Sequence, residues 1–257
     1  MSKSLKIAAI QTPLIWEDPQ ANREMLQQKI KEIEGVDLIV LPEMFTSGFT
    51  MNASAVAEDS NGKTLPWLKK LASQRNSAIT GSVAFKEDGK YFNRMFFVTP
   101  SSEVFTYDKR HTFTLAGEDK VYTVGKEKTI VNYKGWALCL QVCYDLRFPV
   151  FARNVEDYDA LIYVANWPNK RVNAWDVLLK ARAIENMSYC IGVNRIGLDG
   201  NDFEYTGHSA IYDPLGATVV YSEQEETLYA ELDKNLIEKY RNGLKFLSDR
   251  DAFTLLD

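Results

Sequence analysis

The sequence predicts an α/β fold in which two β-sheets stack face to face and helices cover their outer faces. Three observations support this fold class. The first third of the chain alternates strand-like and helix-like segments, the middle holds consecutive strand-like runs, and the alternation then resumes. Alternating segments are typical of sheets covered by helices, whereas consecutive strands form hairpins and meanders. No repeat or flexible linker interrupts the sequence, so we expect residues 1–257 to form a single domain.

The first third predicts three strands and two helices in the order β-α-β-α-β. The apolar run 6–14 predicts a strand, and residues 18–35 predict an amphipathic helix that ends at a glycine. The apolar side chains of this helix share one face: Met25, Leu26, Ile30 and Ile33. The continuous apolar run 36–43 is typical of a strand buried on both faces. Residues 64–76 and 78–85 then predict a second helix and a third strand.

The rest of the chain predicts a meander, a hairpin and a second alternating region. Residues 81–109 hold three strand-like runs separated by the turn signals EDGK and TPSSE. Residues 129–143 predict a hairpin that turns at Lys134–Gly135. The remaining elements are expected as a helix over 148–158, a strand over 159–168, a helix over 173–187, a strand over 189–197, a hairpin over 208–222, a strand over 227–233 and a helix over 234–246.

Composition excludes several classes of function. The net charge is −5, and positive and negative residues are interspersed without a basic stripe, so nucleic acid is not an expected partner. No apolar segment approaches the length that spans a membrane, and the first residues do not resemble a secretory signal. The cysteines Cys139, Cys143 and Cys190 are odd in number and lack metal-ligand spacing. We therefore expect a cytoplasmic protein without a metal, an organic cofactor or a membrane partner.

Three reactive side chains lie where predicted strands end. Glu43 ends the run 36–43, Lys109 ends the meander, and Cys143 ends the predicted hairpin. Sites in α/β proteins form beyond the carboxyl ends of strands, so these side chains are expected to converge on one pocket. A thiol needs a base or a positive potential to react at neutral pH. A carboxylate can accept its proton, and a cation can stabilise the negative charge that develops on a carbonyl oxygen.

Each of these residues also has a purely structural interpretation. Most free cysteines pack in the core, a glutamate after a strand can cap a helix, and a lysine in a charged segment is by default solvated. Taken one at a time, the structural interpretations are favoured for Glu43 and Lys109. His208 precedes a predicted strand, where it can be a hydrogen-bonded structural residue or line a pocket.

The segments "LPEMFTSGF", "YDKRHTF" and "CYDLRFP" resemble, in this order and spacing, motifs of the nitrilase superfamily of carbon–nitrogen hydrolases. The resemblance runs over nearly the whole chain, and "CYDLRFP", "ANWP" and "GHSAIYDPLG" are similar to the omega-amidase branch. It implies a four-layer α-β-β-α sandwich that commonly forms a homodimer through helices. The segments 148–158 and 174–187 are the apolar-rich helices expected at such an interface.

The resemblance also implies roles for individual residues. Glu43 matches the family's base, Lys109 its lysine and Cys143 its nucleophile, and Glu118 is the expected second glutamate near the substrate. The backbone N–H of Tyr144 would join Lys109 in binding the oxyanion. Asp145 and Arg147 are expected to hold the nucleophile turn by a salt bridge.

The expected reaction is hydrolysis of the terminal amide of a small carboxylate-bearing substrate, such as 2-oxoglutaramate or 2-oxosuccinamate, through a cysteine thioester. Trp167 is expected to wall the pocket, and Arg171 to bind the substrate carboxylate at its mouth; the alternative for Arg171 and the adjacent Lys170 is a surface role at the start of a helix. The rival activities are hydrolysis of N-carbamoyl amino acids and of nitriles by the same residues. A further alternative is a binding protein of this fold without catalysis.

Overall fold

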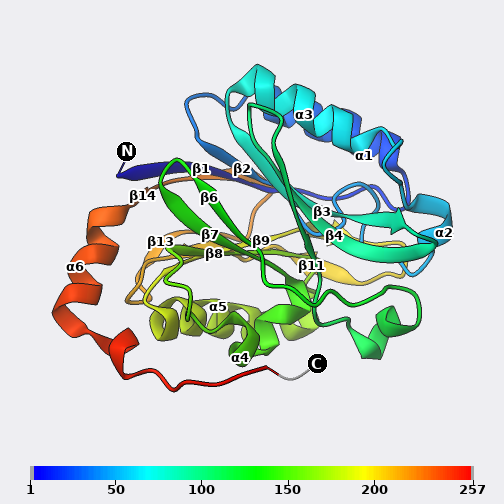
Figure 1. The fold of residues 1–257 in the computed structure, drawn as a ribbon. Coiled ribbons are helices and arrows are strands. Elements are labelled where there is room, and N and C mark those ends of the chain that lie inside the picture. Colours follow the sequence, from blue (N-terminus) through cyan, green and yellow to red (C-terminus); the bar gives the residue numbers. More distant parts are fainter. Residues whose placement is uncertain (1–2, 256–257) are drawn as a thin grey trace.

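The protein is a four-layer α-β-β-α sandwich, which confirms the predicted fold class (Figure 1). A computed structural model describes residues 3–255. Within these residues, two six-stranded sheets stack on each other, and a small two-stranded sheet lies beside them. None of the helices in the described part of the chain has the length and apolar character needed to cross a membrane.

The first sheet contains the strands of the first third of the chain, the meander and one late strand. Its order is β14 (Glu226–Asp233), β1 (Ser4–Gln11), β2 (Leu38–Val40), β3 (Ala78–Glu87), β4 (Lys90–Val98) and β5 (Val104–Asp108). The three strands β1, β2 and β3 are parallel, and β3, β4 and β5 form the predicted antiparallel meander. Strand β14 pairs with β1 over its full length, with Ser4 opposite Asp233 and Gln11 opposite Glu226.

The second sheet contains the later hairpins and the second alternating region. Its order is β13 (Thr218–Ser222), β12 (Ser209–Tyr212), β9 (Tyr189–Asn194), β8 (Ala160–Ala165), β7 (Trp136–Val142) and β6 (Ile130–Tyr133). The β6–β7 hairpin turns at Lys134 and Gly135, as predicted. Strands β10 (Ile196–Leu198) and β11 (Glu204–Thr206) form the small sheet, which the sequence pattern did not indicate.

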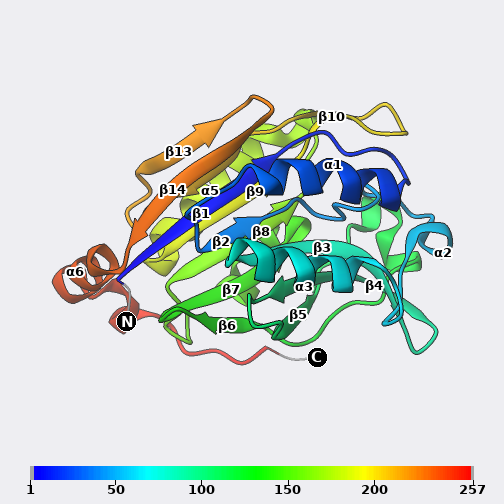
Figure 2. The ribbon, with the colours of Figure 1, turned by 90° about the horizontal axis from the view of Figure 1, so that it is seen from above.

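Helices cover the outer faces of both sheets. Figures 1 and 2 show α1 and α3 on the outside of the first sheet and α5 on the outside of the second. Their bounds are α1 (Pro19–Lys31), α3 (Thr64–Arg75) and α5 (Val172–Asn186), and the shorter helices are α2 (Ala53–Val56), α4 (Pro149–Ala152) and α6 (Lys234–Leu244). Helix α1 begins where the Asp18 side chain accepts a hydrogen bond from the Ala21 backbone N–H, with Pro19 as its first residue.

Burial on both faces explains why the central strands are continuously apolar. In β2, Leu38 and Val40 face the second sheet, whereas Ile39 packs under α1 and α3. In β7, Leu138 and Leu140 face the first sheet. The layer between the sheets is thus apolar and close-packed, and it fixes the strand ends of one sheet relative to those of the other.

The helix expected over residues 148–158 is wrong beyond its first turn, since α4 ends at Ala152. The buried Asn154 accounts for the difference. Its side chain accepts a hydrogen bond from the Tyr158 N–H and donates to the carbonyl oxygens of Tyr158 and Asn186. Asparagine side chains compete in this way with the helical hydrogen bonds of the backbone. The segment therefore forms a compact turn.

Candidate active site

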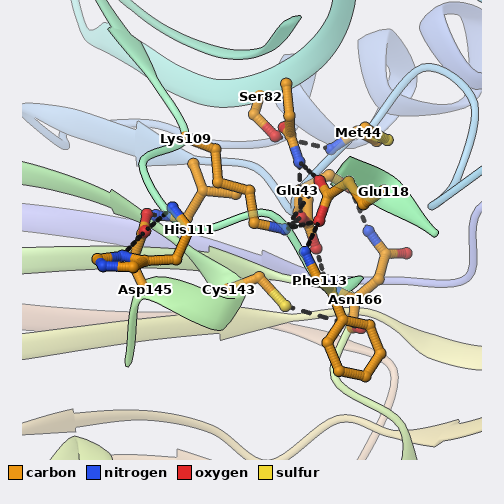
Figure 3. Close-up of polar contacts among 12 residues, drawn as sticks. Glu43, Met44, Ser82, Lys109, His111, Phe113, Glu118, Cys143, Asp145 and Asn166 are labelled. Carbon is orange, nitrogen blue, oxygen red and sulfur yellow. Dashed lines mark hydrogen bonds and ion pairs between the residues drawn. The ribbon is translucent and has the colours of Figure 1, made fainter. Parts of the chain in front are cut away.

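The carboxyl ends of three strands bring Glu43, Lys109 and Cys143 to one region between the sheets (Figure 3). Lys109 directly follows β5, Cys143 directly follows β7, and Glu43 lies shortly after β2. Glu43 and Lys109 therefore extend from the first sheet and Cys143 from the second. The geometry of the site depends on how the two sheets pack.

The Lys109 ammonium group lies between two buried carboxylates. Its Nζ is 2.9 Å from Oε1 of Glu43, and 3.0 and 2.9 Å from the two carboxylate oxygens of Glu118. Burial disfavours the charge of Lys109, but the negative charges of Glu118 and Glu43 outweigh it and raise the pKa of Lys109 above its ordinary value. The lysine is therefore a fixed cation.

Glu118 lies on a short 3-10 turn and is fully buried. One of its carboxylate oxygens accepts a hydrogen bond of 2.5 Å from the Phe113 N–H. Burial raises the pKa of the Glu118 carboxyl, the charge of Lys109 opposes this rise, and the charge of Glu43 adds to it. The structure thus places Glu118 in contact with Lys109, buried away from solvent.

Two asparagines that the sequence interpretation missed hold Glu43 in place. Nδ2 of Asn93 lies 2.8 Å from Oε1 of Glu43, and the Asn166 N–H donates to Oε2, also at 2.8 Å. The Asn166 side chain donates to the Glu43 backbone carbonyl at 2.6 Å. A carboxamide inside an apolar strand was the available signal for Asn93, because a buried amide needs hydrogen-bond partners.

Cys143 occupies a sharp turn between β7 and the 3-10 helix Cys143–Arg147. Its φ angle is 46°, in the left-handed region that non-glycine residues rarely adopt and that often marks functional sites. Sγ lies 3.9 Å from the carbonyl oxygen of Asn166. Burial raises the pKa of the Cys143 thiol, the charge of Glu43 raises it further, and Lys109 partly offsets both. The resting thiol is therefore protonated at neutral pH, and a base must remove its proton during attack.

The expected salt bridge between Asp145 and Arg147 is wrong. The buried Asp145 carboxylate accepts hydrogen bonds from the Tyr107 hydroxyl, the Val142 N–H and the His111 N–H, and contacts His111 Nδ1 at 2.8 Å. These partners tie the Cys143 turn to the segment that carries Lys109. The Arg147 guanidinium stacks instead over the Trp167 ring at 4.8 Å, because the four contacts of Asp145 already use its carboxylate.

The other cysteines and His208 have structural surroundings. Cys139 and Cys190 are fully buried core residues in the layer under α5. His208 contacts Asp176 at 3.0 Å and the Tyr221 hydroxyl at 2.8 Å, and it does not line the cavity beside Cys143.

A cavity of about 710 Å³ opens beside Cys143. Of the residues singled out from the sequence, seven line it: Lys109, Cys143, Tyr144, Arg147, Trp167, Lys170 and Arg171. Glu43 and Glu118 lie behind Lys109 and do not reach the cavity surface. A small molecule in the cavity can therefore reach Cys143 and Lys109. The two carboxylates contact Lys109 from the side that faces away from the cavity.

Cations dominate the mouth of this cavity. The Arg171 guanidinium lies 5.0 Å from the centre of the Phe113 ring, and Arg147 lies over Trp167 as described. Neither guanidinium forms an ion pair with a carboxylate of residues 3–255. The two acids of the lining are engaged elsewhere, because Glu17 bonds to Thr50 and Asn52, and Asp199 accepts from Tyr205. The mouth thus favours an anion.

The family model described as carbon-nitrogen hydrolase matches residues 6–242. The chain belongs to the carbon-nitrogen hydrolase family. It is 44% identical to the omega-amidase YafV of Yersinia enterocolitica over 98% of this chain and 99% of that protein. It is 30% identical to the 2-oxoglutaramate amidase of Bacillus subtilis, with 95% and 96% of the two chains covered. This hydrolase is thus an amidase, as its sequence predicts.

A solved structure supports the assignment to this family. XC1258 of Xanthomonas campestris, a CN-hydrolase superfamily protein with an arsenic adduct in its active site, is 41% identical to this hydrolase. The TM-score is 0.97, and 99% of this chain and 100% of that chain are covered. The match extends over both sheets and their helices.

Proposed function

We propose that this hydrolase is an omega-amidase that releases ammonia from the terminal amide of a small carboxylate-bearing substrate, such as 2-oxoglutaramate or 2-oxosuccinamate. The omega-amidase and 2-oxoglutaramate amidase relatives support this substrate class. The observation that carries the proposal is the Glu43–Lys109–Glu118 network behind a thiol at the base of a cation-rimmed cavity.

In the proposed mechanism, Cys143 is the nucleophile and Glu43 carries protons in both halves of the reaction. Glu43 accepts the proton of the Cys143 thiol as sulfur attacks the amide carbon, which gives a tetrahedral intermediate. Lys109 and the Tyr144 N–H stabilise the oxyanion. Glu43 then returns the proton to the leaving nitrogen, so that ammonia departs and a thioester remains.

Hydrolysis of the thioester completes the cycle. Water loses a proton to Glu43 and attacks the thioester carbon; the acid leaves, and the proton returns to the Cys143 sulfur. Glu118 holds the Lys109 ammonium group in place during both halves of the reaction. The reaction consumes one water and needs no redox partner.

An assay of ammonia release from a panel of substrates tests the proposed function. We expect turnover of 2-oxo-acid monoamides, and little turnover of N-carbamoyl amino acids or nitriles. Carbon dioxide released together with ammonia from a carbamoyl substrate would assign the carbamoylase activity instead. Preferred turnover of nitriles would assign a nitrilase. Binding without turnover of any substrate in the panel would support a non-catalytic role.

Arg171 is proposed to bind the substrate carboxylate. Arg171→Ala should lower kcat/KM for a carboxylate-bearing amide by about ten- to a hundredfold, as expected for loss of a charge-assisted hydrogen bond of roughly 1.5–3 kcal/mol. The uncharged ester of the same amide should lose little. Lys170→Ala is the matched control, because Lys170 also lines the cavity but is exposed and expected to be peripheral. An equal decrease in kcat/KM for both substrates would assign Arg171 a structural role. Arg147, which also lines the cavity, would then be the next candidate for binding the carboxylate.

The hydrolase is also proposed to be a homodimer. On α5, Val177 and Ile184 are 58% and 47% exposed, and the neighbouring β13 exposes Val219 and Tyr221. Exposed apolar side chains gathered on one side of a molecule are typical of an interface between subunits. Sedimentation at micromolar concentration should show a dimer, and Val177→Asp should shift it toward monomer. A monomeric unsubstituted chain at that concentration would contradict the proposal.

The single-domain organisation and the cytoplasmic location remain parts of this proposal. A site assembled from both sheets supports one domain over residues 1–257. Three free thiols fit a reducing compartment.

A further inference from the structure

Asn93 lies on β4, in the first sheet, with its side chain directed at the site. It is almost fully buried, and its backbone carbonyl accepts a hydrogen bond from the Lys109 N–H at 3.0 Å. It does not line the cavity, so it does not touch a substrate there. Its influence on the reaction must therefore pass through neighbouring side chains.

The Asn93 carboxamide bridges the two carboxylates of the site. Nδ2 donates to Oε1 of Glu43 at 2.8 Å and to Oε1 of Glu118 at 3.2 Å. Oδ1 has no hydrogen-bond partner in the described part of the chain, although it is buried. The reversed orientation would set the amide oxygen against two carboxylate oxygens, so the hydrogen-bond network itself determines which way the amide points.

The charges around this bridge do not balance. Two buried carboxylates, Glu43 and Glu118, share a single cation, Lys109. The other titratable groups that face them are the Cys143 thiol and the Tyr122 phenol, which are neutral at neutral pH because burial raises the pKa of each. Burial and the charge of Glu43 accordingly raise the pKa of the Glu118 carboxyl, so the ionised form of the pair needs further stabilisation. A protonated Glu43 could not accept the proton of the thiol.

We propose that Asn93 is a positioning residue that keeps Glu43 ionised and available as the base, by donating its amide protons to both carboxylates without adding a charge. This inference rests on the proposed role of Glu43. Hydrogen bonds donated to a carboxylate stabilise its ionised form. Asn93 also fixes the separation of the two carboxylates opposite Lys109, so that both remain oriented toward the ammonium group.

The test compares pH profiles of variants at this position. In Asn93→Ala, the acid limb of the kcat/KM profile should move to higher pH by roughly one unit, because the ionised pair has lost a donor. KM should change little, since Asn93 does not reach the cavity. Asn93→Asp keeps the shape of the side chain but adds a third carboxyl group, and its acid limb should move at least as far.

Ser82→Ala is the matched control for local disturbance. Ser82 is buried beside the site, and its hydroxyl accepts a hydrogen bond from the Met44 N–H at 2.9 Å, one residue after Glu43. It forms no hydrogen bond with either carboxylate. This variant should lose stability without moving the acid limb. An unchanged limb in both Asn93 variants, with a uniform loss of rate at every pH, would overturn the proposal.

A second measurement separates this inference from the proposed function. The rate at which iodoacetamide alkylates Cys143 follows removal of the thiol proton and does not require turnover, and the other two cysteines are fully buried. Its acid limb should shift in Asn93→Ala and Asn93→Asp as the kinetic limb does. A shifted alkylation profile in a protein that hydrolyses no omega-amide would retain the role of Asn93 and reject the proposed substrate. An unshifted alkylation profile beside normal omega-amide turnover would reject Asn93 alone.

Discussion

Cys143→Ala is expected to reduce ammonia release by roughly ten-thousandfold or more while the protein remains folded. The substitution removes the sulfur that would form the thioester, and no neighbouring thiol can replace it. Cys139 and Cys190 are fully buried in the layer under α5, on the side of the second sheet that faces away from the first. Steady-state ammonia assays and thermal melting measure the two outcomes.

Cys190→Ala provides the matched control for this experiment. It removes the same atoms from a core position, so it should cost some stability and leave most of the activity. Mass spectrometry after brief iodoacetamide treatment should find one label on the unsubstituted protein and none on Cys143→Ala. Retention of more than a few per cent of the turnover by Cys143→Ala would exclude it as the nucleophile.

Lys109→Met is expected to lower the free energy of unfolding by about 3–5 kcal/mol, in addition to removing turnover. The substitution leaves Glu43 and Glu118 buried and facing each other without the cation that both contact. Breaking a buried ion pair on one side is costly because the remaining charge has lost its partner. Denaturant unfolding, followed at several pH values, measures the loss.

The pH dependence of that loss has a definite sign. Without Lys109, the carboxyl pair should hold a proton in the folded protein that it releases on unfolding at neutral pH. Stability lost by the variant should then be largest near neutral pH and shrink as the pH falls toward the ordinary carboxyl range. Adding Glu118→Gln should recover part of the stability but none of the activity. Lys120→Met replaces an exposed lysine and should change neither the stability nor the activity. If Lys109→Met lowered the free energy of unfolding no more than this control does, the buried ion pairs of Lys109 would not stabilise the fold.

Regular segments were predictable from sequence because their apolar patterns report burial directly. The continuous run of β2 and the hairpin turn at Lys134 and Gly135 were recognised in this way. The helix over 148–158 failed because one buried side chain, Asn154, took over the hydrogen bonds of its backbone. The local sequence pattern does not show which distant residues form hydrogen bonds with an asparagine side chain.

The active site shows the same difference between features set by local sequence and features set by distant contacts. Glu43, Lys109 and Cys143 could be singled out from their strand-end positions and motifs. Asn93 had only the weak signal of a carboxamide within a strand, and Asn166 had none, because the importance of both lies in contacts with Glu43, which is far from them in sequence. The expected partner of Asp145 was wrong for a related reason. Arg147 is close to Asp145 in sequence. The Asp145 carboxylate points instead toward Tyr107, on β5 of the first sheet, and His111, which follows that strand.

The pairing of β1 with β14 has a consequence for how the chain folds during synthesis. Residues 4–11 and 226–233 are neighbours in the sheet, so the edge of β1 stays open until residues 226–233 have left the ribosome. Contacts so distant in sequence are slow to form, and an open edge strand invites pairing with other chains. A nascent chain that stalls before residue 226 would expose an apolar strand edge.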